Sequence, residues 1–413
     1  MNNFRVKEGK TGQKYNKNTM DFDESTYNYS SQEKEQLFVD AQFKTKEEKK
    51  IYKAYREEWH RRADEMDAGD KPLAVICELV SSCNLHCEMC YTITPEFQDT
   101  VVGTQRMMPW EQVVKIIDEC AEIGVFSMLF SWRGESTMYR VKSQDGKPKD
   151  FADVLAYARK KGILEVTSLT NGRLMTEELV KKIVDAQPNW ISFSVDGLGE
   201  TYDKVREQVK TDKGQNPFEL LVKNIKVLVE ERDRRGLVKP QIRSNTIFPA
   251  IAENSEKYRE FMEEIGVGMV TINAILDYRG AEMFEDDILD NWFCQYPFQR
   301  LVVSANGTIM ACPGAHNEEE EVAMGLYPGG AKKTVKVNGT DKVIDQPEMT
   351  LLEAWHSKKL SQVRHLHASN RRKDIWACKN CRHGAKKYGA EWIPEEWDME
   401  EMKWEDGRKF RNN

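Results

Sequence analysis

Three closely spaced cysteines are the residues of this sequence best suited to chemistry. Cys83, Cys87 and Cys90 form the pattern C-x3-C-x2-C. Three thiolates in one short loop can bind a soft metal ion or an iron–sulfur cluster. A [4Fe–4S] cluster held by three thiolates keeps one iron open to another ligand, as a catalytic centre requires. A structural zinc site is the alternative, but it needs four ligands, and His86 is poorly spaced to be the fourth. The pattern therefore favours an open, catalytic cluster.

Four further cysteines form a second group towards the C-terminus. Cys294 and Cys312 frame Gly307 in the pattern C-x12-G-x4-C, and Cys378 and Cys381 follow as C-x2-C. Four thiolates suffice for one closed iron–sulfur cluster or for one zinc ion. The sequence therefore predicts a second metal centre, with no open position.

The composition is that of a globular protein without a dominant charge. Of 413 residues, 40% are hydrophobic and 31% charged, and the formal net charge is −7, which gives no electrostatic case for binding nucleic acid or a membrane. The N-terminus lacks the apolar core of a signal peptide, and no apolar run approaches the roughly 20 residues that span a bilayer. We therefore expect a cytoplasmic protein whose nine cysteines are not a disulfide framework. Cys77 and Cys120, in apolar surroundings, are expected to be buried and unreactive.

Strands and helices alternate from about residue 73 and would position the first cysteine loop. The patterns predict six strands, at 73–80, 126–132, 164–170, 190–196, 241–248 and 269–275. They predict intervening helices at 109–124, 150–162, 176–186, 217–235 and 255–266. Such units in series imply a parallel sheet with right-handed crossovers, open or partly closed as a barrel. The cysteine loop follows the first strand, at the sheet edge where such folds carry their sites.

Polar residues alternate along the later strands. One face carries Ser192, Ser194, Asp196, Gln241, Arg243, Asn245, Thr271 and Asn273. Because the other face must pack against helices, we expect this face to point into the barrel. Either these side chains satisfy one another or they surround a polar ligand. For the set as a whole, we favour a cavity that holds polar molecules.

Composition divides the chain into four regions. Residues 1–70 are a polar, partly helical extension without a strand-rich pattern, and residues 71–280 hold the strand–helix units. Residues 281–390 form a smaller unit with the second cysteine group and a predicted hairpin at 332–344. Residues 391–413 are an acidic tail that can form a helix.

The loop from Cys83 to Cys90, between a strand and a helix of a six-stranded β/α chain, strongly resembles the radical SAM superfamily. The resemblance implies a partial (β/α)6 barrel in which the three cysteines bind a [4Fe–4S] cluster and S-adenosylmethionine (SAM) chelates the open iron. In that family, one electron from the cluster cleaves SAM to a 5′-deoxyadenosyl radical, which removes a hydrogen atom from the substrate. Met89 stands where the family often has an aromatic residue, and its soft apolar side chain can lie against adenine.

A second match follows the second predicted strand. Ser131-Trp-Arg-Gly-Glu-Ser136 resembles the family's Gly-Gly-Glu-Pro turn. By that resemblance, Glu135 accepts the methionyl ammonium of SAM and Gly134 lets the backbone approach the ligand. Arg133 replaces the first glycine of the family turn and Ser136 replaces its proline. The charge is therefore kept, while the turn departs from the family's pattern.

Two strand ends and one later residue complete the resemblance at the SAM site. Thr170-Asn171-Gly172 ends the third predicted strand and Ser194-Val-Asp-Gly197 ends the fourth. In similar enzymes these positions contact the ribose and carboxylate of SAM, which implies such roles for Asn171 and Ser194. Arg206 is a candidate partner for a carboxylate, with a surface helix position as the alternative.

The second cysteine group resembles the SPASM/twitch extension of radical SAM enzymes, as do the intervening segments 351–357 and 360–367. The full SPASM pattern has further cysteines, and none follows Cys381. The resemblance therefore implies one auxiliary [4Fe–4S] cluster bound by protein alone, with zinc as the alternative. A closed cluster suits electron transfer or shaping of the pocket.

The expected fold class is α/β: a partial (β/α)6 radical SAM barrel with a small C-terminal iron–sulfur domain of twitch/SPASM type and a helical N-terminal extension. The expected function is abstraction of hydrogen from a small polar substrate of sugar or aminocyclitol type, as a net oxidation, with electrons from a reductant protein such as flavodoxin or ferredoxin. One alternative is a maturase that crosslinks, oxidises or epimerises a ribosomally made peptide. A second is a non-catalytic metal-binding scaffold, against which the open three-cysteine site argues.

Overall fold

The structure is a computed structural model. It describes residues 32–87, 89–90, 92, 97, 105–206, 214–251, 255–273, 293–337, 340–379 and 381. The predicted C-terminal tail at 391–413 and the first part of the N-terminal extension lie outside these residues.

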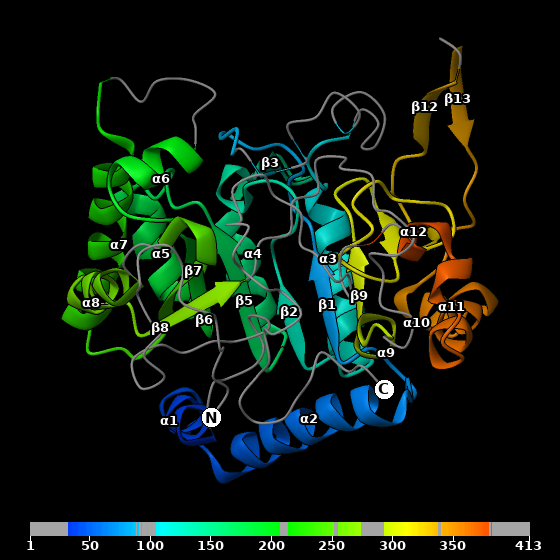
Figure 1. The fold of residues 1–413 in the computed structure, drawn as a ribbon, viewed down its shortest axis with the longest axis horizontal. Helices are drawn as coiled ribbons and strands as arrows, with labels where there is room; N and C mark the ends of the chain where they lie inside the picture. The colour runs from blue at the N-terminus through cyan, green and yellow to red at the C-terminus, as the bar shows by residue number, and fades with distance from the viewer. Residues whose placement is uncertain are drawn as a thin grey trace.

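A nine-stranded sheet forms the centre of the molecule (Figure 1). Six of its strands are parallel neighbours, in the order β1 (Ala74–Cys77), β2 (Ser127–Leu129), β5 (Glu165–Thr170), β6 (Trp190–Ser194), β7 (Gln241–Ile247) and β8 (Met269–Asn273). The helices between them are α3 (Trp110–Glu122), α4 (Phe151–Lys160), α5 (Glu177–Ala186), α6 (Glu200–Val205), α7 (Pro217–Arg234) and α8 (Ser255–Glu264). All six predicted strands and all five predicted helices are confirmed, and several strands end earlier than predicted because their last residues form the loops of the site.

The C-terminal cysteine region continues this same sheet. β9 (Arg300–Val303) pairs in parallel with β1, and β10 (Thr308–Met310) and β11 (Ala323–Leu326) follow as antiparallel strands. These three strands were not predicted, because each is only three or four residues long. At Gly307, between β9 and β10, φ is +93° and a Cβ would lie 2.8 Å from the Cα of Gly330. The glycine of the C-x12-G-x4-C pattern is therefore required by this turn.

Two N-terminal helices cover the edge of the sheet where β1 and β2 begin. α1 (Gln32–Gln42) and α2 (Lys46–Glu65) lie across the lower end of the sheet in Figure 1. Tyr55 of α2 stacks on Phe126, directly before β2, with ring centroids 5.2 Å apart. The Gln299 side-chain amide donates a 2.8 Å hydrogen bond to the Trp59 carbonyl. This edge is thus closed by packing, which leaves the carboxyl ends of the parallel strands for the site.

The remaining elements are short. They are β3 (Arg140–Lys142), β4 (Pro148–Asp150), β12 (Lys333–Val337), β13 (Thr340–Ile344), α9 (Tyr296–Gln299), α10 (Leu351–Trp355), α11 (Lys358–Ala368) and α12 (Trp376–Lys379), with 3-10 turns at Ser136–Met138, Phe248–Ile251 and Arg372–Asp374. β12 and β13 confirm the predicted hairpin. Thr350 and Ser357 cap α10 and α11 by accepting backbone N–H groups of the first turn, which fixes where both helices begin.

The polar strand face is largely buried. Register aligns Ser194 with Asn245 and Asn245 with Thr271 across β6, β7 and β8. Arg243 lies over the rings of Trp190 and Phe38, at 4.7 and 5.1 Å from their centroids. Its guanidinium is therefore covered from the α1 side, so this part of the face packs internally. The cavity for polar molecules remains a prediction.

Candidate cluster and SAM site

The cysteine loop follows β1 at the carboxyl edge of the sheet. A turn brings Cys87 and Cys90 together, since the Cys90 N–H donates to the Cys87 carbonyl at 2.9 Å. Burial raises the pKa of the Cys83 thiol to about 12 and that of Cys87 to about 11. Buried thiols that resist ionisation become thiolates when a metal centre supplies positive charge. The donor set therefore fits an iron–sulfur cluster.

The turn at 133–135 lies against the chain just before Cys83. A Cβ on Gly134 would lie 2.3 Å from the Val80 carbonyl oxygen and 2.5 Å from that of Ser82. The Glu135 N–H donates to the Ser82 carbonyl at 3.0 Å. Only glycine at position 134 allows this approach, which joins the end of β2 to the cysteine loop.

Neighbouring donors hold the Glu135 carboxylate in place. Its Oε1 accepts from the Thr137 N–H at 3.0 Å and from the hydroxyls of Thr137 and Thr170, each at 2.6 Å. Its Oε2 accepts from the Asn171 N–H at 2.7 Å. Oε2 therefore accepts one hydrogen bond where Oε1 accepts three, which leaves Oε2 able to accept from a cationic group.

Two nitrogen donors lie beside the cysteine sulfurs. Asn171 Nδ2 is 2.8 Å from Asn84 Oδ1 and 3.8 Å from Cys83 Sγ. Arg206 Nη1 is 3.7 Å from Cys87 Sγ, and its Nη2 lies 2.6 Å from Asp196 Oδ2. Donors at these positions stabilise thiolate ligands. Arg206 therefore lies at the cysteine loop and is not a surface helix residue.

The structure gathers most of the predicted SAM-site residues. Gly134, Glu135, Asn171 and Arg206 all touch the cysteine loop or its flanks. Ser194 ends β6 in a half-buried position, and Met89 is half-buried within the loop itself. The assignment of these residues to SAM stays a prediction.

The second cysteine group lines one cavity. Cys294, Cys312 and the Cys378–Cys381 turn come from three segments, and their four cysteines share this cavity with His367. Burial raises the pKa of Cys294 to about 12 and those of Cys312 and Cys378 well above the usual range. Within the described ranges, no three His, Cys, Asp or Glu side chains form a group that can hold one metal ion. We therefore base a cluster at this site on the shared cavity and on the family match below.

His367 also lines this site, although its sequence context gives no signal of that role. Its Nδ1 accepts from the Cys294 N–H at 3.2 Å, and its Nε2 lies 3.4 Å from Cys378 Sγ. Burial lowers the pKa of His367 to about 4, so the ring is neutral at pH 7. A neutral ring that accepts at Nδ1 carries its proton on Nε2 and donates it to the sulfur. Only the folded arrangement of α11 and α12 shows this contact.

Comparisons with known proteins match both halves of the chain. The model of the radical SAM superfamily matches residues 78–239, and the model of the SPASM iron–sulfur cluster-binding domain matches residues 294–382. This chain carries a radical SAM domain and a SPASM domain. Such domains bind, respectively, a [4Fe–4S] cluster with SAM and auxiliary iron–sulfur clusters.

Two curated relatives align with parts of this radical SAM/SPASM chain. An Fe-coproporphyrin III synthase of Methanosarcina barkeri is 34% identical over 33% of this chain and 30% of its own length. A tungsten-containing aldehyde ferredoxin oxidoreductase cofactor-modifying protein of Pyrococcus furiosus is 25% identical over 59% of this chain and 64% of its own. The chain thus spans less than two thirds of either relative.

A solved structure supports the fold. The structure of native anSMEcpe with bound AdoMet superimposes with a TM-score of 0.50 and 15% identity, over 76% of this chain and 89% of that one. The predicted fold class is confirmed. In the part of the chain that the structure describes, no helix is long and apolar enough to cross a membrane.

Iron content tests the two cysteine groups. We expect reconstituted wild-type protein to hold about eight irons and eight sulfides per chain, the content of two [4Fe–4S] clusters. A Cys378→Ala/Cys381→Ala variant should keep about four of each, because the first group is untouched. Cys120→Ala, which removes a buried thiol outside both groups, is the matched control and should keep about eight. Zinc at the second site, with about four irons in the wild type, would contradict this assignment.

Removal of the His367 donor should change the redox potential of the auxiliary site. A hydrogen bond to a ligand sulfur favours the reduced cluster. We therefore expect His367→Phe to lower the reduction potential of one cluster by on the order of 60 mV, the one-electron equivalent of about 1.4 kcal/mol. A redox titration followed by EPR measures this shift. His365→Phe, on the exposed side of the same helix, is the control, and equal potentials in both variants would contradict the role of His367.

Proposed function

We propose that this chain oxidises a small polar molecule by radical chemistry. When bound, SAM and the two clusters supply a 5′-deoxyadenosyl radical at the barrel mouth and an acceptor for a second electron. In the net reaction, the substrate loses two hydrogen atoms and SAM is split into methionine and 5′-deoxyadenosine. One substrate hydrogen enters 5′-deoxyadenosine, and the other leaves as a proton and an electron. A reductant protein such as flavodoxin or ferredoxin supplies the electron that cleaves SAM.

The observation that carries this proposal is the fixed Glu135 carboxylate, on a residue whose backbone N–H bonds to Ser82, directly before Cys83. Four hydrogen bonds hold Glu135, and the remaining acceptor position of Oε2 suits the ammonium of a SAM bound to the open iron. Asn171 and Arg206 place donors beside two of the ligand sulfurs. A structural zinc site does not require a carboxylate next to the cysteine loop that can accept an ammonium group.

The polar row on β6, β7 and β8 supports a substrate rich in hydroxyl or amino groups. Ser194, Asn245 and Thr271 are aligned in register near the carboxyl ends of these strands. Hydroxyl and amide side chains at these positions can bind a sugar or an aminocyclitol. The substrate would then lie at the barrel mouth, where the 5′-deoxyadenosyl radical would form.

A second candidate substrate is a cofactor or its precursor. The two curated relatives are named for Fe-coproporphyrin III synthesis and for cofactor modification. Since each aligns with less than two thirds of its own length, we rank this candidate behind the small polar molecule. Maturation of a ribosomal peptide has no specific support among the described contacts.

Deuterium transfer tests the function and the substrate class together. Reduced, anaerobic enzyme with SAM should release 5′-deoxyadenosine, and only the correct substrate class, supplied deuterated, should place deuterium in it. The panel would contain sugars and aminocyclitols, a coproporphyrin, and short peptides. Glu135→Gln should slow 5′-deoxyadenosine release about 10- to 100-fold, the loss of a hydrogen bond to a charged group. Glu122→Gln, at an exposed position of α3, is the control.

The outcomes of this experiment are distinct. Deuterium transfer from the coproporphyrin alone would replace the sugar-type proposal with the second candidate. Absence of 5′-deoxyadenosine from enzyme that holds about eight irons would overturn the radical mechanism itself.

A further inference from the structure

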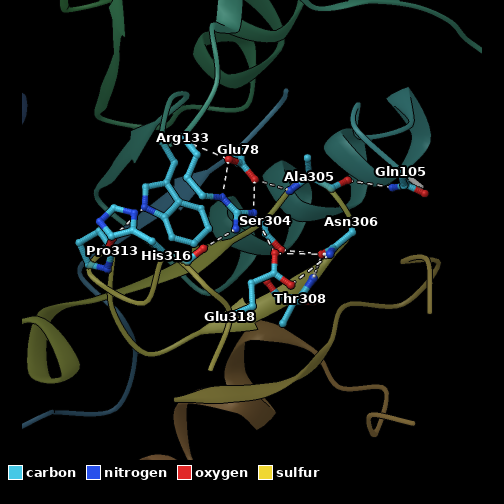
Figure 2. Close-up of polar contacts among 11 residues, drawn as sticks. Glu78, Gln105, Arg133, Ser304, Ala305, Asn306, Thr308, Pro313, His316 and Glu318 are labelled. Carbon is cyan, nitrogen blue, oxygen red and sulfur yellow. Dashed lines mark hydrogen bonds and ion pairs between the residues drawn. The ribbon is translucent and has the colours of Figure 1, made fainter. Parts of the chain in front are cut away.

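The residue that departs from the family turn, Arg133, is buried between two carboxylates. Figure 2 shows its guanidinium between Glu78 and Glu318. Arg133 Nε lies 2.8 Å from Glu78 Oε1, and Nη2 lies 2.7 Å from Glu78 Oε2 and 2.8 Å from Glu318 Oε1. All three side chains are fully buried. A guanidinium that bridges two carboxylates in this way fixes the relative orientation of the segments that carry them.

The two carboxylates belong to the two halves of the molecule. Glu78 directly follows β1 of the barrel and also accepts from the Ala305 N–H, in the turn between β9 and β10, at 2.9 Å. Glu318 lies in the loop after Cys312 and accepts from Asn306 Nδ2 at 3.1 Å (Figure 2). The backbone of Glu318 has φ of +49°, a left-handed conformation that is uncommon for a residue with a side chain. Its carboxylate thus reaches Arg133 from a tight turn of the loop.

Trp132 contacts Pro313, the residue that follows Cys312. Its Nε1 donates to the Pro313 carbonyl at 2.8 Å, and its ring stacks on His316 with centroids 6.0 Å apart. Arg133 lies over the same indole ring at 4.0 Å and donates through Nη1 to the His316 carbonyl at 3.0 Å. Two consecutive residues of the barrel therefore hold the Cys312 loop from Pro313 to Glu318.

The same turn holds the other cysteine loop. The Glu135 N–H is bonded to the carbonyl of Ser82, the residue before Cys83, and Trp132 Nε1 is bonded to the carbonyl of Pro313, the residue after Cys312. Four consecutive residues, 132–135, thus connect the neighbours of one ligand from each cysteine group. The separation of the two cysteine groups is therefore set across one short stretch of backbone.

We propose that Trp132 and Arg133, with Glu78 and Glu318, form a clasp that sets the distance and orientation between the SAM-binding cluster and the auxiliary cluster. Trp132 and Arg133 are positioning residues in this role, because they act through Pro313, His316 and the two carboxylates. The rate of electron transfer between two centres depends steeply on their separation, so a rigid clasp makes that rate reproducible from one turnover to the next. The inference rests on the presence of both clusters and is independent of the substrate proposed above.

A role in stability alone does not explain this arrangement. A buried ion pair is often no more stabilising than apolar residues of the same volume, so selection for stability does not require it. The bonds of the clasp end beside cysteines of both groups. Those of Arg159, a largely covered arginine of α4, go to the carbonyls of Ile163 and Leu164 before β5 and to the side chain of Asn189. Arg159 is therefore a matched control for loss of an arginine without loss of the clasp.

Pulsed EPR of the dipolar coupling between the two reduced clusters tests the clasp without any substrate. The first variant, Glu78→Gln/Arg133→Met/Glu318→Gln, removes all three charges together and so leaves no unpaired buried charge. The second, Trp132→Phe, keeps an aromatic ring and all three charges and removes the bond to Pro313. In both, we expect the coupling to shift and broaden relative to wild type, with a larger effect in the triple variant. Arg159→Met should lower thermal stability and leave the coupling unchanged.

The result decides the proposal in each case. A shifted or broadened coupling in either clasp variant, with about eight irons retained and Arg159→Met unchanged, supports the clasp. Couplings that superimpose on wild type in both clasp variants overturn it. If the triple variant does not fold, Trp132→Phe alone decides. Because the measurement uses neither SAM cleavage nor a substrate, a failure of the proposed oxidation leaves this outcome untouched.

Discussion

The close approach of Gly134 to the backbone of Val80 and Ser82 is the contact on which the site depends. It joins the end of β2 to the chain that leads into Cys83, at a distance that no side chain tolerates. The neighbours of Gly134 then face opposite ways: Glu135 towards Thr170 and Asn171 at the end of β5, and Arg133 towards Glu78 and Glu318. Three strand ends and the auxiliary loop are thereby fixed relative to one turn.

The two edges of the sheet serve different purposes. At the edge where the parallel strands begin, aromatic residues of α1 and α2 cover the barrel, and Arg243 lies over rings from both the sheet and α1. At the carboxyl edge, buried thiols with raised pKa values lie beside Asn171 and Arg206. The buried thiols thus lie at the edge where a bound metal centre would supply the positive charge that stabilises their thiolate form. The closed edge supplies the apolar burial that offsets this polar site.

Local sequence patterns predicted much of the fold and part of the site. Strand and helix periodicity located the six parallel strands and their helices, because each is encoded within its own segment. Cysteine spacing predicted both cysteine groups, and the short Gly-Glu signal after the second strand located Gly134 and Glu135. Their roles towards SAM remain predictions, although the contacts place most of these residues together.

Features that depend on contacts between distant segments were not predictable. The pairing of β9 with β1 joins residues more than two hundred positions apart, and no local sequence pattern predicts it. In the sequence, Arg133 is only a departure from a family motif, because its partners Glu78 and Glu318 lie 55 and 185 positions away. His367 is one histidine among seven, and only the packing of α11 against the Cys378 segment distinguishes it. In each case the decisive information is a long-range distance.

Mössbauer spectroscopy of protein reconstituted with ⁵⁷Fe, recorded with and without SAM, tests most directly that one cluster is open to SAM and the other closed. We predict two [4Fe–4S] clusters, of which one changes its spectrum when SAM is added while the other does not. Identical spectra with and without SAM, or a change in both clusters, would contradict this prediction.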